Sequence, residues 1–212
     1  MRIALASDAW APQTNGVVTT LKATADTLAQ QGHEVHVISP RGLRSIACPS
    51  YPEIRLAVLP GAHVARQLRS FRPHAIHVAT EGPVGLAVRG YCRARGVPFT
   101  TSYHTRYPEY LRARWPIPLT ATYAWLRRFH GAAARTFISS ASLERQLTQR
   151  GFQHLHLWPT GHARASRRRT TPASLLRFHG QRSCRTWFDG ARRVPGREGA
   201  ESAAAKCRVR SR

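Results

Sequence analysis

The sequence has few acidic residues and no long hydrophobic run. Its 212 residues contain 33 Lys and Arg against 10 Asp and Glu, which gives a formal net charge of +23. No segment reaches the roughly 18 uncharged apolar residues of a membrane-spanning helix, and the N-terminal segment lacks the apolar core of a secretory signal peptide. We therefore expect a cytoplasmic protein without a membrane span, whose positive charge needs an explanation.

Closely spaced cysteines are also missing. The four cysteines, Cys48, Cys92, Cys184 and Cys207, are widely separated, and the sequence contains no Cys-x-x-Cys pair. This spacing argues against a zinc knuckle and against a disulfide framework, so we expect reduced thiols. The histidines that occur in pairs have no nearby cysteines or spaced carboxylates, so the sequence predicts no metal site.

Composition divides the chain into two unequal parts near Gly161. Residues 1–160 carry a net charge of +12, and the last 52 residues carry +11. In the last 52 residues Leu, Ile, Val and Phe make up about 12%, below the roughly 20% at which a folded core becomes hard to build. We predict that residues 162–212 form an Arg-rich, disordered basic tail with no domain, translated from a shifted reading frame of GC-rich DNA.

Residues 1–161 have the apolar periodicity of alternating strands and helices. Strands are predicted at residues 3–8, 33–39, 54–59, 75–79, 98–105, 136–139 and 152–158. Helices are predicted at residues 17–28, 64–71, 83–96, 107–130 with interruptions at Pro116 and Pro118, and 142–149. This alternation indicates an α/β fold, a Rossmann-like parallel sheet covered by helices on both faces.

In such sheets ligands bind beyond the carboxyl ends of the strands. After the first strand, an Asn15-Gly16 turn leads into a helix. The free N–H groups of that helix suit a phosphate or sugar oxygen, although the turn is equally consistent with an ordinary helix entry. After the strand at 75–79, Glu81 stands at a helix start, either as a cap matched to the helix dipole or as an acceptor for ligand hydroxyls.

The densest group of polar and aromatic side chains is the segment 102–110, Ser-Tyr-His-Thr-Arg-Tyr-Pro-Glu-Tyr. A histidine at a strand end, here His104, can donate to a sugar hydroxyl or a leaving group, although a lone histidine there is more commonly a hydrogen-bonded core residue. Arg106 can hold an anion, and the aromatic rings can stack on a sugar face. The segment is therefore the best candidate site in the sequence.

Residues 112–129 combine Trp and Tyr with flanking arginines. This composition suits a helix at a lipid interface, or a packed helix whose arginines extend to solvent. The stripe formed by Leu119, Tyr123 and Leu126 favours the packed helix.

Five motifs follow one another in an order that is familiar from a known family. They are Ala-Leu-Ala-Ser-Asp-Ala-Trp-Ala-Pro-Gln-Thr-Asn-Gly-Val-Val at 4–18, Gly-His-Glu-Val at 32–35, His-Val-Ala-Thr-Glu-Gly-Pro at 77–83, the segment 102–110, and Ala-Trp-Leu-Arg-Arg-Phe-His at 124–130. Together they resemble family 4 glycosyltransferases of the GT-B fold, in the branch of mannosyl- and sulfoquinovosyltransferase-like enzymes. The resemblance covers residues 1 to about 161.

The resemblance implies a retaining transferase that moves a hexose from a nucleotide sugar, such as GDP-mannose or a UDP-sugar, to a lipid or glycan acceptor. It implies no metal and no other cofactor, and it allows peripheral contact with the anionic inner face of a membrane. On this basis Asn15 and Gly16 would approach the donor phosphate and sugar, and His104 would line the catalytic cleft.

The resemblance also implies an acceptor side, which would be faced by Glu81, Arg106 and Tyr110. Beyond residue 161 the family would continue into a second Rossmann-like domain that grips the donor nucleotide. The last 52 residues are too few for such a domain, which needs more than roughly 100. We therefore expect residues 1–161 to be the acceptor-side half of a transferase, with little activity alone. Two alternatives are nonspecific nucleic-acid binding through charge and a non-catalytic partner of an intact transferase.

Overall fold

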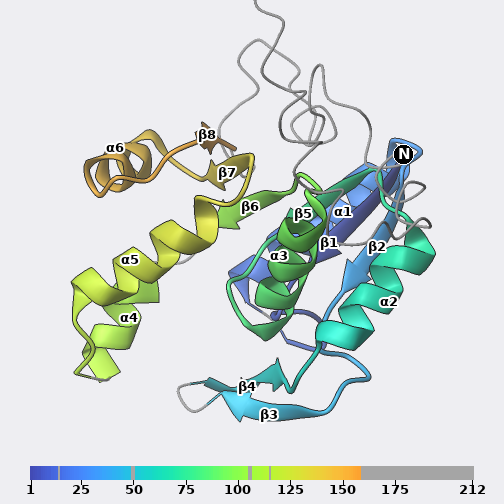
Figure 1. The fold of residues 1–212 in the computed structure, drawn as a ribbon, viewed down its shortest axis with the longest axis horizontal. Helices are drawn as coiled ribbons and strands as arrows, with labels where there is room; N and C mark the ends of the chain where they lie inside the picture. The colour runs from blue at the N-terminus through green and yellow to red at the C-terminus, as the bar shows by residue number, and fades with distance from the viewer. Residues whose placement is uncertain (14, 49–50, 105–106, 115, 159–212) are drawn as a thin grey trace, which may run out of the picture.

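A computed structural model describes residues 1–13, 15–48, 51–104, 107–114 and 116–158, which are coloured in Figure 1. The predicted tail, residues 162–212, lies outside the described residues. Six strands belong to one sheet: β1 (Arg2–Ala6), β2 (Glu34–Ile38), β5 (Ala75–Val78), β6 (Thr100–Tyr103), β7 (Arg135–Ile138) and β8 (Leu155–Leu157). Their order is β2-β1-β5-β6-β7-β8. All neighbouring strands are parallel, and a parallel sheet is what the sequence predicted.

The described helices are α1 (Gly16–Gln30), α2 (Gly61–Phe71), α3 (Pro83–Arg95), α4 (Tyr107–Arg114), α5 (Leu119–His130) and α6 (Ala141–Gln149). They cover both faces of the sheet because successive residues of a strand point to opposite sides. Ile3 and Leu5 of β1 pack in one cluster with Leu28 of α1. Ala4 and Ala6 belong to the opposite cluster, with α2 and α3, which lie side by side in Figure 1. The fold is therefore the predicted Rossmann-like α/β layer structure.

The sequence prediction was incomplete between residues 40 and 60. A two-stranded antiparallel hairpin, β3 (Ser45–Cys48) and β4 (Tyr51–Ala57), lies apart from the main sheet, at the bottom of Figure 1. Only one strand, at 54–59, was predicted there. β3 was missed because it is short and two of its four residues are exposed, so it has no buried alternation to detect.

The region of residues 107–130 behaves as its prolines predicted. Helix α4 ends at Arg114 and α5 begins at Leu119, directly after Pro118. In α5 the side chains of Tyr123 and Leu126 are buried, as the stripe predicted for a packed helix. Within the described part of the chain, no helix combines the length and apolar character that a membrane crossing requires.

Candidate active site

The first feature at the carboxyl edge of the sheet is a link between the ends of β1 and β5. The carboxylate of Asp8 accepts hydrogen bonds from the backbone N–H groups of Val84 (2.8 Å) and Gly85 (3.3 Å) and from the hydroxyl of Thr80 (2.9 Å). Burial raises the pKa of Asp8, and these three hydrogen bonds oppose that rise. Asp8 therefore caps helix α3 from a different strand.

Two glycines make this link sterically feasible. A Cβ atom on Gly82 would lie 2.5 Å from the carboxylate carbon of Asp8, and one on Gly85 would lie 1.9 Å from the carbonyl oxygen of Thr80. Both distances are too short for non-bonded atoms, so a side chain at either position would push α3 away from the strand ends. The sequence Gly-Pro-Val-Gly thus fixes where α3 begins.

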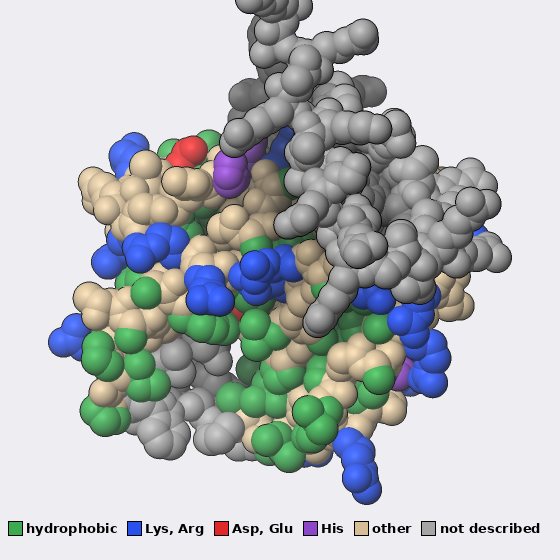
Figure 2. All heavy atoms as spheres, viewed as in Figure 1, with side chains coloured by type: hydrophobic (Ala, Val, Ile, Leu, Met, Phe, Trp, Pro, Cys, Tyr) green, Lys and Arg blue, Asp and Glu red, His purple; other side chains and the backbone are tan. Residues whose placement is uncertain are grey.

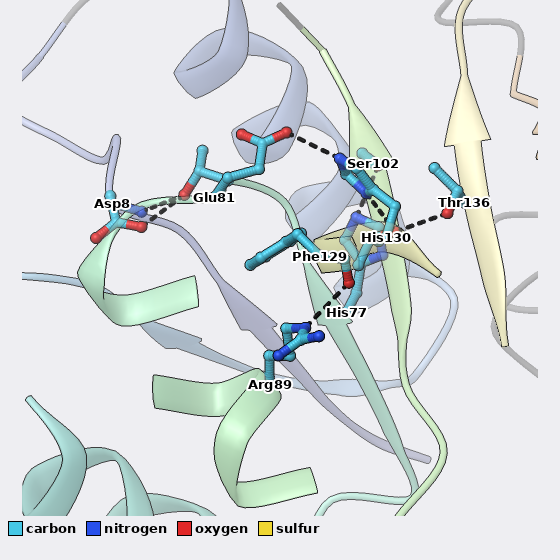
Figure 3. Close-up of polar contacts among 10 residues, drawn as sticks. Asp8, His77, Glu81, Arg89, Ser102, Phe129, His130 and Thr136 are labelled. Carbon is cyan, nitrogen blue, oxygen red and sulfur yellow. Dashed lines mark hydrogen bonds and ion pairs between the residues drawn. The ribbon is translucent and has the colours of Figure 1, made fainter. Parts of the chain in front are cut away.

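Asp8 overturns one of the two roles considered for Glu81. Helix α3 begins after Gly82 without a side-chain cap of its own, and the cap that it receives comes from Asp8. Instead, an oxygen of Glu81 lies 3.2 Å from Nε2 of His130, the last residue of α5 (Figure 3). The sequence did not show that Glu81 leaves the cap of α3 to another residue, because that residue, Asp8, is 73 positions earlier in the chain.

The predicted histidine, His104, follows β6 directly and is near this pair. Its Nε2 atom is buried and has no hydrogen-bond partner among the described residues. Burial lowers the pKa of His104, with Glu81 raising it and His130 lowering it. An unpaired buried polar atom in a native fold calls for an explanation, and a ligand group is one. The common alternative, a fully hydrogen-bonded core histidine, does not describe this Nε2.

The predicted helix-entry turn is present at the start of α1. The side-chain oxygen of Asn15 accepts a hydrogen bond from the backbone N–H of Val18 at 3.0 Å, so Asn15 is the N-cap of α1. A Cβ atom on Gly16 would meet nothing within 4 Å, and the backbone of Gly16 has no left-handed conformation. The protein itself therefore does not require glycine at this position.

Two predicted acceptor-side residues cannot be placed. Arg106 lies outside the described residues, and so does the side chain of Tyr110, although its backbone belongs to α4. Nearby, the hydroxyl of Tyr123 donates a 2.6 Å hydrogen bond to Glu109, which ties α4 to α5. Among the described residues no group of three His, Cys, Asp or Glu side chains could hold a metal ion.

Several residues in and beside this edge were given no individual role by the sequence prediction. Nδ1 of His130 lies 2.9 Å from the hydroxyl of Thr101, which lies 3.0 Å from the hydroxyl of Thr136 on β7. On the opposite face of β6, the ring of His77 lies between the hydroxyls of Thr100 (2.8 Å) and Ser102 (2.9 Å). The usable signal was the run of buried hydroxyl residues in β6, since buried polar groups need partners.

Comparison with known proteins identifies the class. The sequence model of Glycosyltransferase Family 4 matches residues 14–163, more than half of the chain. The chain therefore belongs to glycosyltransferase family 4, as the motifs indicated.

Individual relatives each match half of the chain or more. A GDP-mannose-dependent alpha-mannosyltransferase of Mycobacterium tuberculosis is 29% identical over 180 residues, which are 76% of this chain and 47% of the relative. A protein of the same name from Corynebacterium glutamicum is 25% identical over 219 residues, 92% of this chain and 50% of the relative. An alpha-monoglucosyldiacylglycerol synthase of Streptococcus pneumoniae is 27% identical over 124 residues, 52% of this chain and 28% of the relative. The chain thus spans about half the length of the mannosyltransferases that it matches.

Proposed function

We propose that this chain provides the acceptor-side half of a glycosyltransferase that moves a hexose from a nucleotide sugar to a lipid or glycan acceptor. The observation that carries the proposal is the buried Nε2 of His104, which has no hydrogen-bond partner among the described residues. It lies near the Glu81 and His130 pair, at the carboxyl edge of a parallel sheet. The names of the relatives favour GDP-mannose as the donor and a diacylglycerol-type lipid as one class of acceptor.

Each site residue has a role in this proposal. His104 hydrogen-bonds the transferred sugar, which satisfies its Nε2 atom only when substrate is bound. The start of α1 at Asn15 and Gly16 meets the donor phosphate, because helix N-terminal N–H groups attract anions and the space beside Gly16 is open. Glu81, which does not cap α3, accepts a hydrogen bond from a hydroxyl of the acceptor substrate. Arg106 and Tyr110 remain proposed acceptor-side residues on sequence alone.

The proposed reaction retains the configuration of the sugar and uses no metal. The glycosidic bond to the nucleotide phosphate breaks as the acceptor oxygen forms its bond to the same sugar carbon. The leaving phosphate takes the proton of the acceptor hydroxyl. The protein contributes fixed hydrogen-bond donors and correct placement of both substrates, which together can account for most of a rate enhancement.

The donor nucleotide requires a second domain in this proposal. About half of each mannosyltransferase relative lies outside the stretch that matches this chain. We propose that the tail comes from a shifted reading frame. Translation of all three frames of the gene beyond codon 161 tests this directly: a second sheet-and-helix domain in another frame supports it, and its absence contradicts it.

The function is tested with a chimera in which residues 1–161 replace the matching half of the Mycobacterium tuberculosis relative. Transfer from GDP-mannose to the acceptor of that relative is measured in the chimera, in the 212-residue chain and in the parent enzyme. We expect transfer by the chimera and none by the 212-residue chain. A folded chimera that binds GDP-mannose but transfers nothing would contradict the proposed role of residues 1–161.

The alternative based on charge is tested with the same samples. Figure 2 shows Lys and Arg side chains in several separate groups on the face that it draws, whereas a nucleic-acid groove concentrates them along one path. Binding of the 212-residue chain to oligonucleotides with a steep salt dependence, together with an inactive chimera, would favour the nucleic-acid alternative. Co-purification with an intact relative would instead favour a non-catalytic partner.

A further inference from the structure

The side chain of His130 links the interior of the sheet to its carboxyl edge. His130 is 1% exposed, at the end of α5. One ring nitrogen, Nδ1, lies 2.9 Å from the hydroxyl of Thr101, and the other, Nε2, lies 3.2 Å from Oε1 of Glu81. Thr101 in turn lies 3.0 Å from the hydroxyl of Thr136. A continuous chain of hydrogen bonds therefore runs from β7 through β6 and α5 to the turn before α3 (Figure 3).

The surroundings of His130 are aromatic. The ring centroids of Tyr103, Phe129 and Phe152 lie 5.7, 5.1 and 6.2 Å from that of His130. In such a setting the two ring nitrogens depend on protein partners, since an unsatisfied buried polar group is costly and water has little access. The three hydrogen bonds of the chain are therefore mutually dependent.

The numbers of donors and acceptors determine which way each hydrogen bond between Thr136 and Glu81 is donated. An ionised Glu81 can only accept, so Nε2 of His130 must carry the proton that it donates to Oε1. In a neutral imidazole Nδ1 is then an acceptor, and the hydroxyl of Thr101 must donate to it. The oxygen of Thr101 is left to accept from the hydroxyl of Thr136. All three hydrogen bonds are thus donated in the direction of Glu81, by the hydroxyls of Thr136 and Thr101 and by Nε2–H of His130.

The second buried histidine of this region lacks such a connection. The ring of His77 lies between the hydroxyls of Thr100 and Ser102, and among the residues that the structure describes it has no carboxylate as a hydrogen-bond partner. Burial lowers the pKa of His77 to about 3, so the ring is neutral at physiological pH. His77 holds two residues of the same strand, whereas His130 reaches an acid at the edge where ligands bind.

We propose that His130 is a positioning residue that fixes the carboxylate of Glu81 at the edge of the site. This role rests on the proposed function, because Glu81 matters there as the acceptor of a substrate hydrogen bond. With Oε1 held by His130, the other oxygen, Oε2, is outside the chain of hydrogen bonds. Because the hydrogen bond to Oε1 restricts the side-chain torsions of Glu81, Oε2 also has a fixed direction. A substrate hydroxyl would therefore meet an acceptor that is already in place.

The inference is tested in the 212-residue chain by NMR, without any substrate. ¹⁵N shifts of the His130 ring report which nitrogen carries the proton, and three-bond couplings of Glu81 report whether its side chain occupies one rotamer. We expect a pyrrole-like Nε2, a pyridine-like Nδ1 and a single Glu81 rotamer. In Glu81→Gln the preference for the Nε2 proton is lost, because an amide can donate as well as accept.

Substitutions at three positions separate positioning from packing. His130→Leu averages the rotamers of Glu81, and His130→Gln, which keeps an amide donor, restores part of the single rotamer. Thr101→Val disturbs the His130 tautomer, whereas Thr100→Val, which removes the same hydroxyl on the other face of β6, leaves it unchanged. If His130→Leu does not fold, Thr101→Val and Glu81→Gln still decide.

Two results would overturn the inference. One is an Nε2 atom of His130 that carries no proton in the unsubstituted chain. The other is a Glu81 rotamer that stays single in His130→Leu. Neither result involves turnover, so failure of this inference is distinct from failure of the proposed function, which would show as a folded but inactive chimera.

Discussion

The two faces of strand β6 carry similar polar groups with different consequences. On one face the ring of His77 lies among Thr100, Ser102, Phe137 and Trp158, and its hydrogen-bond partners within the described part of the chain, Thr100 and Ser102, are both buried. On the other face the ring of His130 contacts the buried hydroxyl of Thr101 with one nitrogen and the carboxylate of Glu81, at the edge of the sheet, with the other. Burial of a histidine therefore does not reveal its role. The two histidines differ in where their hydrogen bonds end, at buried hydroxyls for His77 and at the carboxylate of Glu81 for His130.

The difference between the faces depends on the position of α3, because Glu81 lies in the turn before that helix. Gly85→Ala places a Cβ atom where the Thr80 carbonyl oxygen lies, 1.9 Å away. We expect a loss of about 3 kcal/mol or more in the free energy of unfolding, measured by urea titration. Gly90→Ala in the same helix is the control: its Cβ meets nothing within 4 Å, so it should stabilise by about 0.5–1 kcal/mol. Equal effects of the two substitutions would refute the close approach of α3 to the strand ends.

The face of β6 that carries His77 is tested by the pH dependence of the free energy of unfolding. The pKa of His77 is about 3 in the folded chain, against 6.5 as its ordinary value. Between these values the unfolded state binds the proton that the folded state excludes, so stability falls as the pH decreases from 6.5 toward 3. Relative to His77→Gln, we expect the unsubstituted chain to lose about 1.4 kcal/mol per pH unit in that window. A difference that is constant with pH would show that His77 is not buried in the neutral form.

Removal of one hydroxyl on each face distinguishes stability from function. Thr100→Val and Thr101→Val each leave a buried histidine nitrogen without its partner, so each should cost about 1–2 kcal/mol of unfolding free energy. In the chimera only Thr101→Val should also lower the rate of transfer, because only that face leads to Glu81. Equal transfer rates in the two variants would remove the functional distinction between the faces.

The smallest expected effect concerns the start of α1. Asn15→Ala removes the cap and should cost about 1 kcal/mol, while Asn15→Ser keeps a capping oxygen and most of the stability. If Asn15 also approaches the donor, Asn15→Ser should raise the KM for GDP-mannose in the chimera despite normal stability. An unchanged KM in Asn15→Ser would reduce Asn15 to a helix cap.

The sequence was sufficient for the sheet and its helices because their signal is local. The continuous apolar run from Ile3 to Ala6 and the helical spacing in α3 follow directly from residue order. The division of α4 from α5 was equally local, since it depends on Pro116 and Pro118. Of the hairpin only the strand at 54–59 was predicted, because β3 has four residues, two of them exposed, and its pairing with β4 leaves no periodic signal in the sequence.

The site was only partly predictable because its connections are long in sequence. His104 and Glu81 were selected because each follows a strand. That Glu81 is not the cap of α3 depends on the hydrogen bond between Asp8 and Val84, which are 76 positions apart. His130 stands at the end of a helix, where a histidine commonly has only a favourable dipole contact. Its partners, Thr101 and Glu81, are 29 and 49 positions away, and periodicity carries no information about them.

The central claim is that the edge containing His104 is where the sugar is transferred. The most direct measurement is the transfer rate of the chimera with His104→Ala, beside His156→Ala, which removes an exposed histidine of β8. Loss of one preorganised hydrogen bond to the reacting group should lower kcat by about 100-fold or more in His104→Ala, with little change in His156→Ala. A folded His104→Ala chimera that transfers sugar as fast as the unsubstituted chimera would contradict the claim.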